Sequence, residues 1–202
     1  MTETTSRRNA HRPAAVLASI ALATGAFAGA GVVMAGPALA DVPASSEQTA
    51  RFEVDFLTGM IDHHAMAVSM AEMCLEEGVH DELIATCESI ITSQSTQIEQ
   101  MQAWLQDWYG IDYEPGTSSG GSMNHLANLS GEEFEVAFMR SMIRHHWGAI
   151  REAEKCFDNA EHPDLLTLCE DIYTAQLEEI EQMQTWLDDW YGIPGGRPVS
   201  TA

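Results

Sequence analysis

The sequence predicts an all-α fold, a four-helix bundle over residues 52–193 built from two tandem helical hairpins. Residues 52–111 recur as residues 134–193 with a constant offset of 82 positions and no gap, and about half of the aligned residues are identical. Both copies space their apolar residues at i, i+3 and i+4, which is typical of amphipathic helices, and neither shows the alternation of a strand. Each copy is therefore expected to form one αα-hairpin, with an internal twofold relating the two.

Turn-forming residues set the expected bounds of the long helices. In the first copy, a helix is expected over residues 52–77, because Gly78 can end it, and a return helix over residues 81–109, because Gly110 follows. In the second copy, Pro163 marks the same corner, since proline is tolerated at the first position of a helix. The return helix is thus expected to run antiparallel to the helix before it.

Residues 112–130 separate the two copies and have the composition of a linker, with a run of Gly and Ser. A connection of this length is expected to cross over one end of the bundle. Ser130, with Glu133 three residues later, is a capping-box signature for the start of the next helix. Outside the bundle, residues 41–51 are expected to be a flexible lead and residues 194–202 a frayed tail.

The first 40 residues have the features of an export signal peptide. Three arginines precede a small, apolar run over residues 14–35, and Ala38-Leu39-Ala40 matches an A-x-A cleavage site. The protein is therefore expected to be exported, and to be periplasmic, secreted or associated with the cell envelope. An uncleaved N-terminal anchor is the alternative, because the apolar run is nearly long enough to span a bilayer.

The chain is strongly acidic, with 31 Asp and Glu against 9 Lys and Arg and a formal net charge of −22. Removal of the predicted signal takes away three arginines and one glutamate, which leaves 30 acidic and 6 basic residues and a net charge of −24. Such a charge disfavours nucleic acid and anionic membrane surfaces as partners. Four of the remaining cations, Arg140, Arg144, Arg151 and Lys155, share one helix face, which is expected to be a solvated face or, alternatively, a docking patch for an acidic partner.

The four cysteines lie at matched positions of the two copies, on either side of each expected corner: Cys74, Cys87, Cys156 and Cys169. In an exported protein this arrangement indicates one disulfide within each hairpin, Cys74–Cys87 and Cys156–Cys169. Thiolate metal ligands are the alternative, although the spacing is neither C-x-x-C nor a zinc-finger pattern. His80 and His162 lie at the same corners, where caps or surface residues are expected.

Histidines and methionines recur at helical spacing in the first helix of the first copy. At about 100° per residue, His63 and His64 flank a narrow apolar stripe centred on Met60. Three further methionines continue the His63 side of this stripe as a ridge: Met66, Met70 and Met73. Imidazole and thioether groups on a rigid helix are ligands that a soft transition-metal ion prefers, so this face predicts a metal site. Flexible core filling is the alternative for the methionines.

The second copy repeats the histidine pair without the methionine ridge. His145 and His146 align with the first pair, whereas Gly148, Glu152 and Lys155 replace the ridge methionines. If the twofold brings the first and third long helices together, the four imidazoles converge in the interior, supported by polar residues of the return helices. The remaining candidate metal ligands are Met60, Met101, Met142 and Met183, and the candidate supporting residues are Gln94, Gln176 and Glu179.

Both copies carry the same two-part motif. It reads Met-Ile-x-His-His-x-x-Ala on the first helix and Gln-x-x-(Glu/Gln)-Ile-x-x-Met-x-x-Trp-Leu on the return helix. The first copy has Met60, Ile61, His63, His64, Ala67, Gln94, Gln97, Ile98, Met101, Trp104 and Leu105, and the second has Met142, Ile143, His145, His146, Ala149, Gln176, Glu179, Ile180, Met183, Trp186 and Leu187. This pattern, which extends over nearly the whole mature chain, resembles the domain of unknown function 305 family. The resemblance implies a ferritin-like four-helix bundle, usually exported, with copper binding in some members.

Two features bear on the kind of metal. The position that is acidic in the family is the amide Gln97 in the first copy, whereas the second copy has Glu179. Neither copy has a Glu-x-x-His motif on its helices, so di-iron carboxylate chemistry is disfavoured. Thioethers select Cu(I), and imidazole accepts copper in either oxidation state.

These features predict an exported copper-binding protein that sequesters or passes on Cu(I), with Cu(II) as a further candidate and a copper-handling protein as a candidate partner. Nothing in the sequence indicates an activated nucleophile, a phosphate loop or a nucleotide site, so no catalytic residue is expected. Two alternatives stay open. One is a non-catalytic envelope interaction module in which the histidine pairs form a polar layer that fixes helix register. The other is a metal-dependent oxidase.

Overall fold

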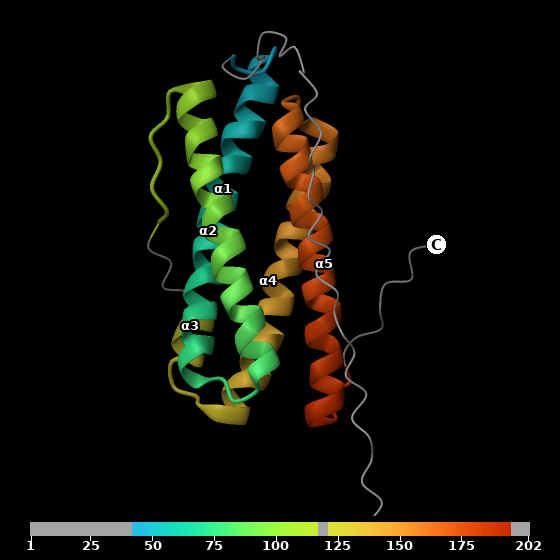
Figure 1. Cartoon of the computed structure of the whole chain (residues 1–202). Helices are drawn as coiled ribbons and strands as arrows, with labels where there is room; N and C mark the ends of the chain where they lie inside the picture. Colours follow the sequence, from blue (N-terminus) through green and yellow to red (C-terminus); the bar gives the residue numbers. More distant parts are fainter. Residues whose placement is uncertain (1–41, 117–120, 195–202) are drawn as a thin grey trace, which may run out of the picture. The chain divides into compact units, whose positions relative to one another are not determined.

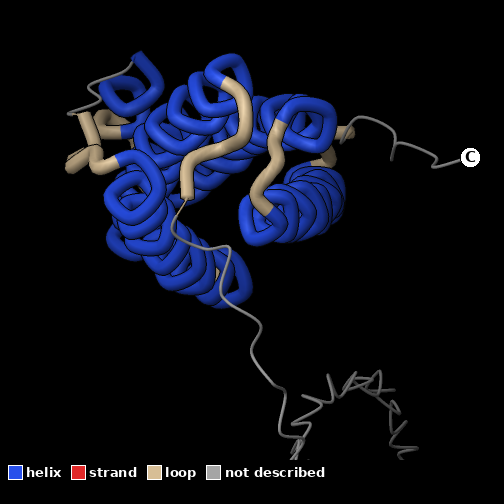
Figure 2. The backbone as a smooth tube through the Cα atoms, turned by 90° about the horizontal axis from the view of Figure 1, so that it is seen from above, coloured by secondary structure: helices blue, strands red, loops and turns tan. Residues whose placement is uncertain are grey.

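The fold is seen in a computed structural model, which describes residues 42–116 and 121–194. The predicted signal peptide and most of the predicted tail lie outside the described residues. The described ranges contain helices and loops but no strand (Figure 1, Figure 2): α1 (Glu47–Glu77), α2 (Asp81–Tyr109), α3 (Gly121–Leu126), α4 (Gly131–Asn159) and α5 (Pro163–Tyr191). The predicted all-α fold is therefore confirmed, and none of the described helices is both long and apolar enough to cross a membrane.

The four long helices form two hairpins that meet along α1 and α4. α1 packs against α2, α4 packs against α5, and the short helix α3 lies against both α1 and α4 (Figure 1). Glu53 at the start of α1 reaches the corner of the second hairpin, and Glu135 at the start of α4 reaches the corner of the first. α1 and α4 are therefore antiparallel, and the two hairpins exchange equivalent contacts, as the predicted internal twofold requires.

The buried core consists of two apolar clusters that are separated by the level of the histidine pairs. Along α1 the first cluster ends at Ile61 and the second begins at Ala67, and along α4 the two clusters are bounded by Ala149 and Met142. The histidine pairs occupy these intervals, because they continue the helical spacing of the apolar residues on each helix. The repeat thus places a polar level in the middle of an otherwise apolar interior.

α1 begins at Glu47, earlier than the predicted start at Phe52 and inside the segment expected to be a flexible lead. The reason is an N-cap, since the Ser46 hydroxyl accepts a hydrogen bond from the backbone N of Thr49 at 3.1 Å. Just before the helix, the backbone N and the hydroxyl of Ser45 both donate to Glu161 Oε2 at 2.8 Å. The lead is therefore tied to the corner of the second hairpin.

The segment expected to be a linker contains the short helix α3. Its Leu126 is fully buried and belongs to the second core cluster, which explains why this part of the connection folds back onto the bundle. The capping box predicted at Ser130 is not formed. Ser130 takes the N-cap position of α4, but its hydroxyl makes no capping hydrogen bond, and only its backbone carbonyl accepts from Phe134 N at 3.3 Å.

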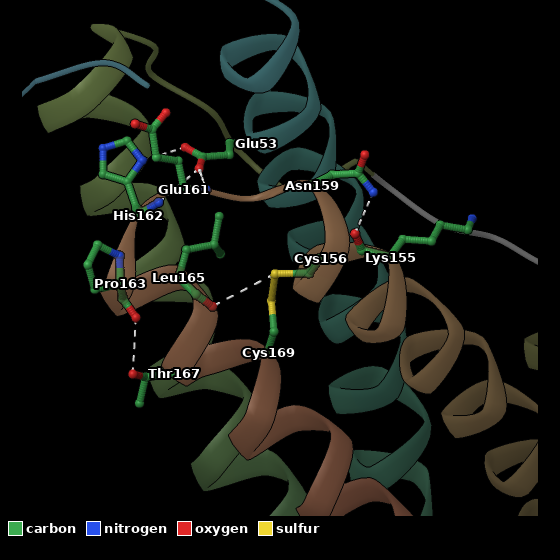
Figure 3. The surroundings of a disulfide bond; sticks show 10 residues. All are labelled: Glu53, Lys155, Cys156, Asn159, Glu161, His162, Pro163, Leu165, Thr167 and Cys169. Atoms are coloured by element: carbon green, nitrogen blue, oxygen red, sulfur yellow. Dashed lines mark hydrogen bonds and ion pairs between the residues drawn. A yellow bond between two sulfur atoms is a disulfide. The ribbon is translucent and has the colours of Figure 1, made fainter. Parts of the chain in front are cut away.

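Each hairpin holds one disulfide near its corner, in the pairing expected from the matched spacing. Cys74 bonds to Cys87, and Cys156 bonds to Cys169 (Figure 3), each with a sequence separation of 13 residues. All four sulfurs are used, so the alternative of thiolate metal ligands is not realised. Each bridge joins the end of one long helix to the start of the next.

Replacement of both cysteines of one pair, Cys156→Ala with Cys169→Ala, is expected to lower the free energy of unfolding by about 3 kcal/mol. The unfolded chain regains the loop entropy that the bridge removes, and the loop length is the same in both hairpins. Urea denaturation without reductant measures the change. The pair Cys74→Ala with Cys87→Ala should give a similar loss, and a stability equal to that of the wild type in either variant would contradict the expectation.

A buried carboxylate joins the start of each hairpin to the corner of the other. Glu53 Oε1 accepts from the backbone N of Glu161 at 2.7 Å and of His162 at 3.1 Å (Figure 3), while Oε2 accepts from His162 Nδ1 at 2.5 Å. Tyr109 donates to the same carboxylate at 2.5 Å, and Trp108 stacks on the His162 ring with centroids 3.8 Å apart. His162 takes the N-cap position of α5, as expected for a cap, but its side chain makes no capping hydrogen bond and lies in an interior cluster, so the alternative of a surface residue is wrong.

Candidate metal centre

The inner histidines of the two pairs lie against each other where α1 meets α4. The ring centroids of His63 and His145 are 3.6 Å apart, with an interplanar angle of 33°, and His63 Nε2 donates to the backbone oxygen of His145 at 3.1 Å. The contact depends on Gly148, because a Cβ atom at that position would lie 3.1 Å from His63 Nε2. The glycine that replaces a ridge methionine in the second copy thus makes room for an imidazole of the first.

The outer histidines are fully buried and point to the return helices. His64 Nε2 donates to Gln97 Oε1 at 2.8 Å, and His146 Nε2 donates to Glu179 Oε2 at 2.6 Å. Within each pair, the ring centroids are 6.3 Å apart in the first copy and 6.1 Å apart in the second. The structure therefore brings the two pairs together, with the inner rings in contact and each outer ring beside the inner ring of its own pair.

Several polar atoms of this level are buried without a hydrogen-bond partner. They are His63 Nδ1, His64 Nδ1, His146 Nδ1, both ring nitrogens of His145, and the amide oxygens of Gln94 and Gln176. Because three of the rings donate from Nε2, their Nδ1 atoms carry lone pairs. With the two amide oxygens and one nitrogen of neutral His145, the level presents a surplus of buried acceptors. Each such group costs free energy unless a donor or a cation meets it, so the arrangement is suited to bind a cation.

Burial keeps three of these imidazoles free of protons near pH 7. It lowers the pKa of His63 from 6.5 to about 4 and that of His64 to about 3, because the charged ring would lose its hydration. The pKa of His145 falls to about 2, through burial and through the neighbouring His63 ring. The three rings are therefore neutral near pH 7, which is the state in which imidazole binds a metal.

The methionines gather mainly on one side of the histidine level. The second core cluster contains Met70, Met139, Met142 and Met183, with Met66, Met73 and Met123 packed partly buried against it, whereas the first contains Met60 and Met101. Of the candidate ligands, Met66 and Met73 keep partial exposure, and Met60, Met70, Met101, Met142 and Met183 are at most 2% exposed. Within the ridge, Met66 and Met73 are thus partly exposed to solvent, whereas Met70 and the other candidate thioethers lie inside the core.

Comparison with known proteins identifies the family. The model of the family described as "Domain of unknown function (DUF305)" matches residues 34–105 and, in a second match, residues 53–187. The chain belongs to the DUF305 family. The resemblance inferred from the two-part motif is thereby confirmed, whereas no curated protein matches the chain.

Solved structures with the same fold include several of CopM and of DUF305 proteins. CopM in its Cu(I)-bound form is 34% identical, with a TM-score of 0.64 over 69% of this chain and 98% of that chain. CopM in its Cu(II)-bound form gives a TM-score of 0.63, again at 34% identity over 69% of this chain and 97% of that one. A DUF305 fragment from Deinococcus radiodurans is 31% identical, with a TM-score of 0.62 over 72% of this chain and 97% of that chain.

The supporting residues of this DUF305 centre are only partly those that were expected. Glu179 contacts His146 directly, but Gln94 and Gln176, although buried, leave their amide oxygens without a partner. Gln97 holds His64 in their place and was not among the expected supporting residues. The signal for it was present, because His64 and Gln97 have the same 33-residue separation as His146 and Glu179.

Other surfaces of the DUF305 chain offer less to a metal. Within the described ranges, no three His, Cys, Asp or Glu side chains are grouped as a metal site. A surface hollow of about 530 Å³ lies beside α3 and α4, lined by His125, Arg140 and Arg144 among others, and contains none of the paired histidines. Arg140, Arg144, Arg151 and Lys155 are all exposed, as expected for a solvated face.

Proposed function

We propose that this DUF305 protein is an exported, non-catalytic copper-binding protein that sequesters or transfers Cu(I), and also accepts Cu(II), through imidazole and thioether ligands. Copper is the cargo, and the mechanism is ligand exchange without bond-making chemistry. The single observation that carries the proposal is the level of contacting imidazoles with ring nitrogens that are buried without a hydrogen-bond partner. Such lone pairs at the contact of two helices favour a cation with an affinity for nitrogen and sulfur.

The inner histidine of the second copy is the best placed ligand. Both ring nitrogens of His145 lack a partner, so copper displaces no hydrogen bond from this ring. In the first copy the equivalent ring, His63, lies against Gly148. The internal twofold relates this contact to one between His145 and Met66, because the offset of 82 residues makes Met66 the equivalent of Gly148. We infer that copper first binds between the His145 imidazole and the partly exposed Met66 thioether.

The relatives support copper as the cargo. The solved structures of CopM, 34% identical to this chain, include Cu(I)-bound, Cu(II)-bound and silver-bound forms. Cu(I) and Ag(I) share a preference for soft donors, which fits the thioethers that line one side of the histidine level here. The DUF305 family as such is described without a function.

The disulfides support an exported location. A bridge in each hairpin is typical of proteins that fold in an oxidising compartment such as the periplasm or the cell exterior. This agrees with the signal peptide expected in residues 1–40. A copper-handling protein in the same compartment is the expected partner, since buried copper must be delivered and collected by ligand exchange.

Substitution of His145 by leucine is expected to weaken Cu(I) binding more than tenfold. Loss of a residue that only supports a metal ligand already lowers metal affinity by at least about tenfold, and His145 is proposed as a ligand itself. The stability of the copper-free protein should change little, because both ring nitrogens of His145 are unpartnered and the backbone oxygen that accepts from His63 remains. Anaerobic titration with Cu(I) against a competing chelator measures the affinity, and urea denaturation measures the stability.

The triple variant Met66→Leu, Met70→Leu, Met73→Leu tests the thioethers in the same titration. Leucine preserves volume in the core, so a loss of affinity reports lost sulfur ligands. Exposed His125 provides the control, as His125→Leu should bind copper like the wild type. Equal, weak binding by the wild type and all variants would contradict the proposal.

The hydrogen bonds of the outer histidines favour one alternative, a non-catalytic envelope interaction module with structural histidine pairs. His64 and His146 each have a defined side-chain partner, as a polar layer that fixes helix register would require. In that case the His145→Leu protein would keep whatever copper binding the wild type shows. The same titration therefore separates the two functions.

A further inference from the structure

The two outer histidines have hydrogen-bond partners that differ in charge. His64 and His146 are equivalent residues of the two copies, and both are fully buried. Their Nε2 atoms donate to oxygens of side chains 33 residues further along the chain, Gln97 Oε1 at 2.8 Å and Glu179 Oε2 at 2.6 Å. The two copies thus share the geometry and differ in the acceptor, which is a neutral amide in the first copy and a carboxylate in the second.

The acceptor bound at Nε2 also affects Nδ1, the other nitrogen of each ring. Because Nε2 keeps its proton in both bonds, Nδ1 of His64 and of His146 carries the lone pair, and neither atom has a partner. A carboxylate that accepts from an imidazole raises the basicity of the ring toward a bound metal and places a negative charge close to the ion. An amide acceptor orients the ring in the same way but adds no charge.

The carboxylate acts on this imidazole alone among the described residues. Glu179 makes no other hydrogen bond or ion pair within the described ranges. Its side chain is 21% exposed, whereas the His146 side chain is fully buried. The carboxylate thus lies between solvent and a fully buried ring. In the first copy, Gln97 likewise has one side-chain partner among the described residues, the His64 ring.

We propose that Gln97 and Glu179 give two otherwise equivalent imidazoles different preferences for the oxidation state of copper. His64, held by a neutral amide, favours Cu(I), whereas His146, held by a carboxylate, favours Cu(II), since a more basic and more negative environment stabilises the higher charge. Gln97 and Glu179 are then positioning residues that act through the rings. The inference rests on the proposed copper binding and adds which half of the duplication suits which ion.

Exchange of the two acceptors tests the inference. The purified variants Glu179→Gln and Gln97→Glu are compared with the wild type by chelator competition, under air for Cu(II) and without oxygen for Cu(I). Glu179→Gln is expected to lower the ratio of Cu(II) to Cu(I) affinity by about 10- to 100-fold, which corresponds to a rise of roughly 60–120 mV in the reduction potential of bound copper. Gln97→Glu is expected to shift the ratio and the potential in the opposite direction.

Two control variants separate hydrogen bonding from net charge. Glu178→Gln and Gln100→Glu make the same charge changes on α5 and α2 at exposed positions. Their ratios should stay close to that of the wild type, because exposed charges are screened by salt. An equal shift in these controls would assign the effect to net charge and overturn the inference.

Failure of the inference is distinguishable from failure of the proposed function. Copper binding by the wild type with an unchanged affinity ratio in both acceptor variants would overturn the inference and leave the proposed function standing. A loss of unfolding free energy with equal weakening for Cu(I) and Cu(II) would show a merely structural role and also overturn it. No copper binding by the wild type would overturn both.

Discussion

Replacement of Glu53 by alanine is expected to lower the free energy of unfolding by about 3–5 kcal/mol and the melting temperature by roughly 6–20 °C. Glu53 is fully buried, and its carboxylate accepts hydrogen bonds from Tyr109, Glu161 and His162. Alanine would leave two backbone N–H groups, a ring N–H and a hydroxyl in the interior without their acceptor. Such unpaired groups, and the lost link between the two hairpins, account for the size of the effect.

The equivalent variant of the other hairpin provides a graded comparison. Glu135 accepts from Val79 N at 2.7 Å, from His80 N at 2.8 Å and from His80 Nδ1 at 2.6 Å, and Tyr191 donates to it as well. The His80 side chain is 32% exposed, compared with 8% for His162, so water can replace part of the lost bonding. Glu135→Ala is therefore expected to cost less than Glu53→Ala.

Thermal and urea unfolding of both variants measure these losses. Asp55→Ala is the matched control, since Asp55 is an exposed acidic residue of α1 and its removal should change stability by less than about 0.5 kcal/mol. Glu53→Gln keeps an oxygen for the backbone donors and should fall between the wild type and Glu53→Ala. A Glu53→Ala protein as stable as the Asp55→Ala protein would contradict a role of this carboxylate in joining the hairpins.

The bounds of the helices could be predicted wherever a local signal sets them. α2 ends at Tyr109 because Gly110 follows in the left-handed conformation, and α5 begins at Pro163, both as the turn residues indicated. α1 and α3 departed from prediction for reasons that lie outside the repeat. Ser46 caps α1 before the repeated segment begins. α3 is held by the burial of Leu126, and a helix of six residues is too short to show a helical period in the sequence.

The candidate site was only partly predictable, because the contact of His63 with the backbone of His145 crosses between the hairpins. The approach of the histidine pairs followed from the repeat and its twofold, and the contact of the His63 ring with the His145 ring agrees with that expectation. Glu53 was overlooked, although it lies about 20° from Met60 on the apolar stripe, where a carboxylate must have buried partners. Those partners are at the far corner, at Glu161 and His162, and only the packing of α1 on α4 brings them close.

Acidification of the copper-free protein from about pH 7.5 to about pH 5 is expected to lower the free energy of unfolding by about 2 kcal/mol for each of three buried imidazoles. The pKa values of His63, His64 and His145 are lowered in the folded state to about 4, about 3 and about 2, from an ordinary value of 6.5. Between these values and 6.5 the unfolded chain binds protons that the folded chain does not. Stability is therefore fully present above pH 6.5 and is lost as the pH falls toward the folded values.

Urea denaturation at several pH values measures this dependence, and variants assign it. His145→Leu removes one of the three groups and should reduce the pH dependence by about a third, whereas His125→Leu, at an exposed position, should leave it unchanged. The buried carboxylates Glu53 and Glu135 interfere little in this range, because their pKa values are lowered below 4.5. A stability that does not change between about pH 7.5 and pH 5 would show that the three rings are not held neutral by burial.

The same burial connects stability to the proposed copper binding. A solvated histidine with a pKa near 6.5 loses its metal to protons when the pH falls to about 5, whereas a ring with a folded pKa of about 4 or lower keeps its lone pair. Copper-binding competence at mildly acidic pH therefore has a cost in the stability of the metal-free fold. The disulfides and the buried carboxylates at the two corners offset that cost, since they hold the hairpins together on both sides of the histidine level. Copper, by binding the folded state alone, should reduce the loss of stability on acidification.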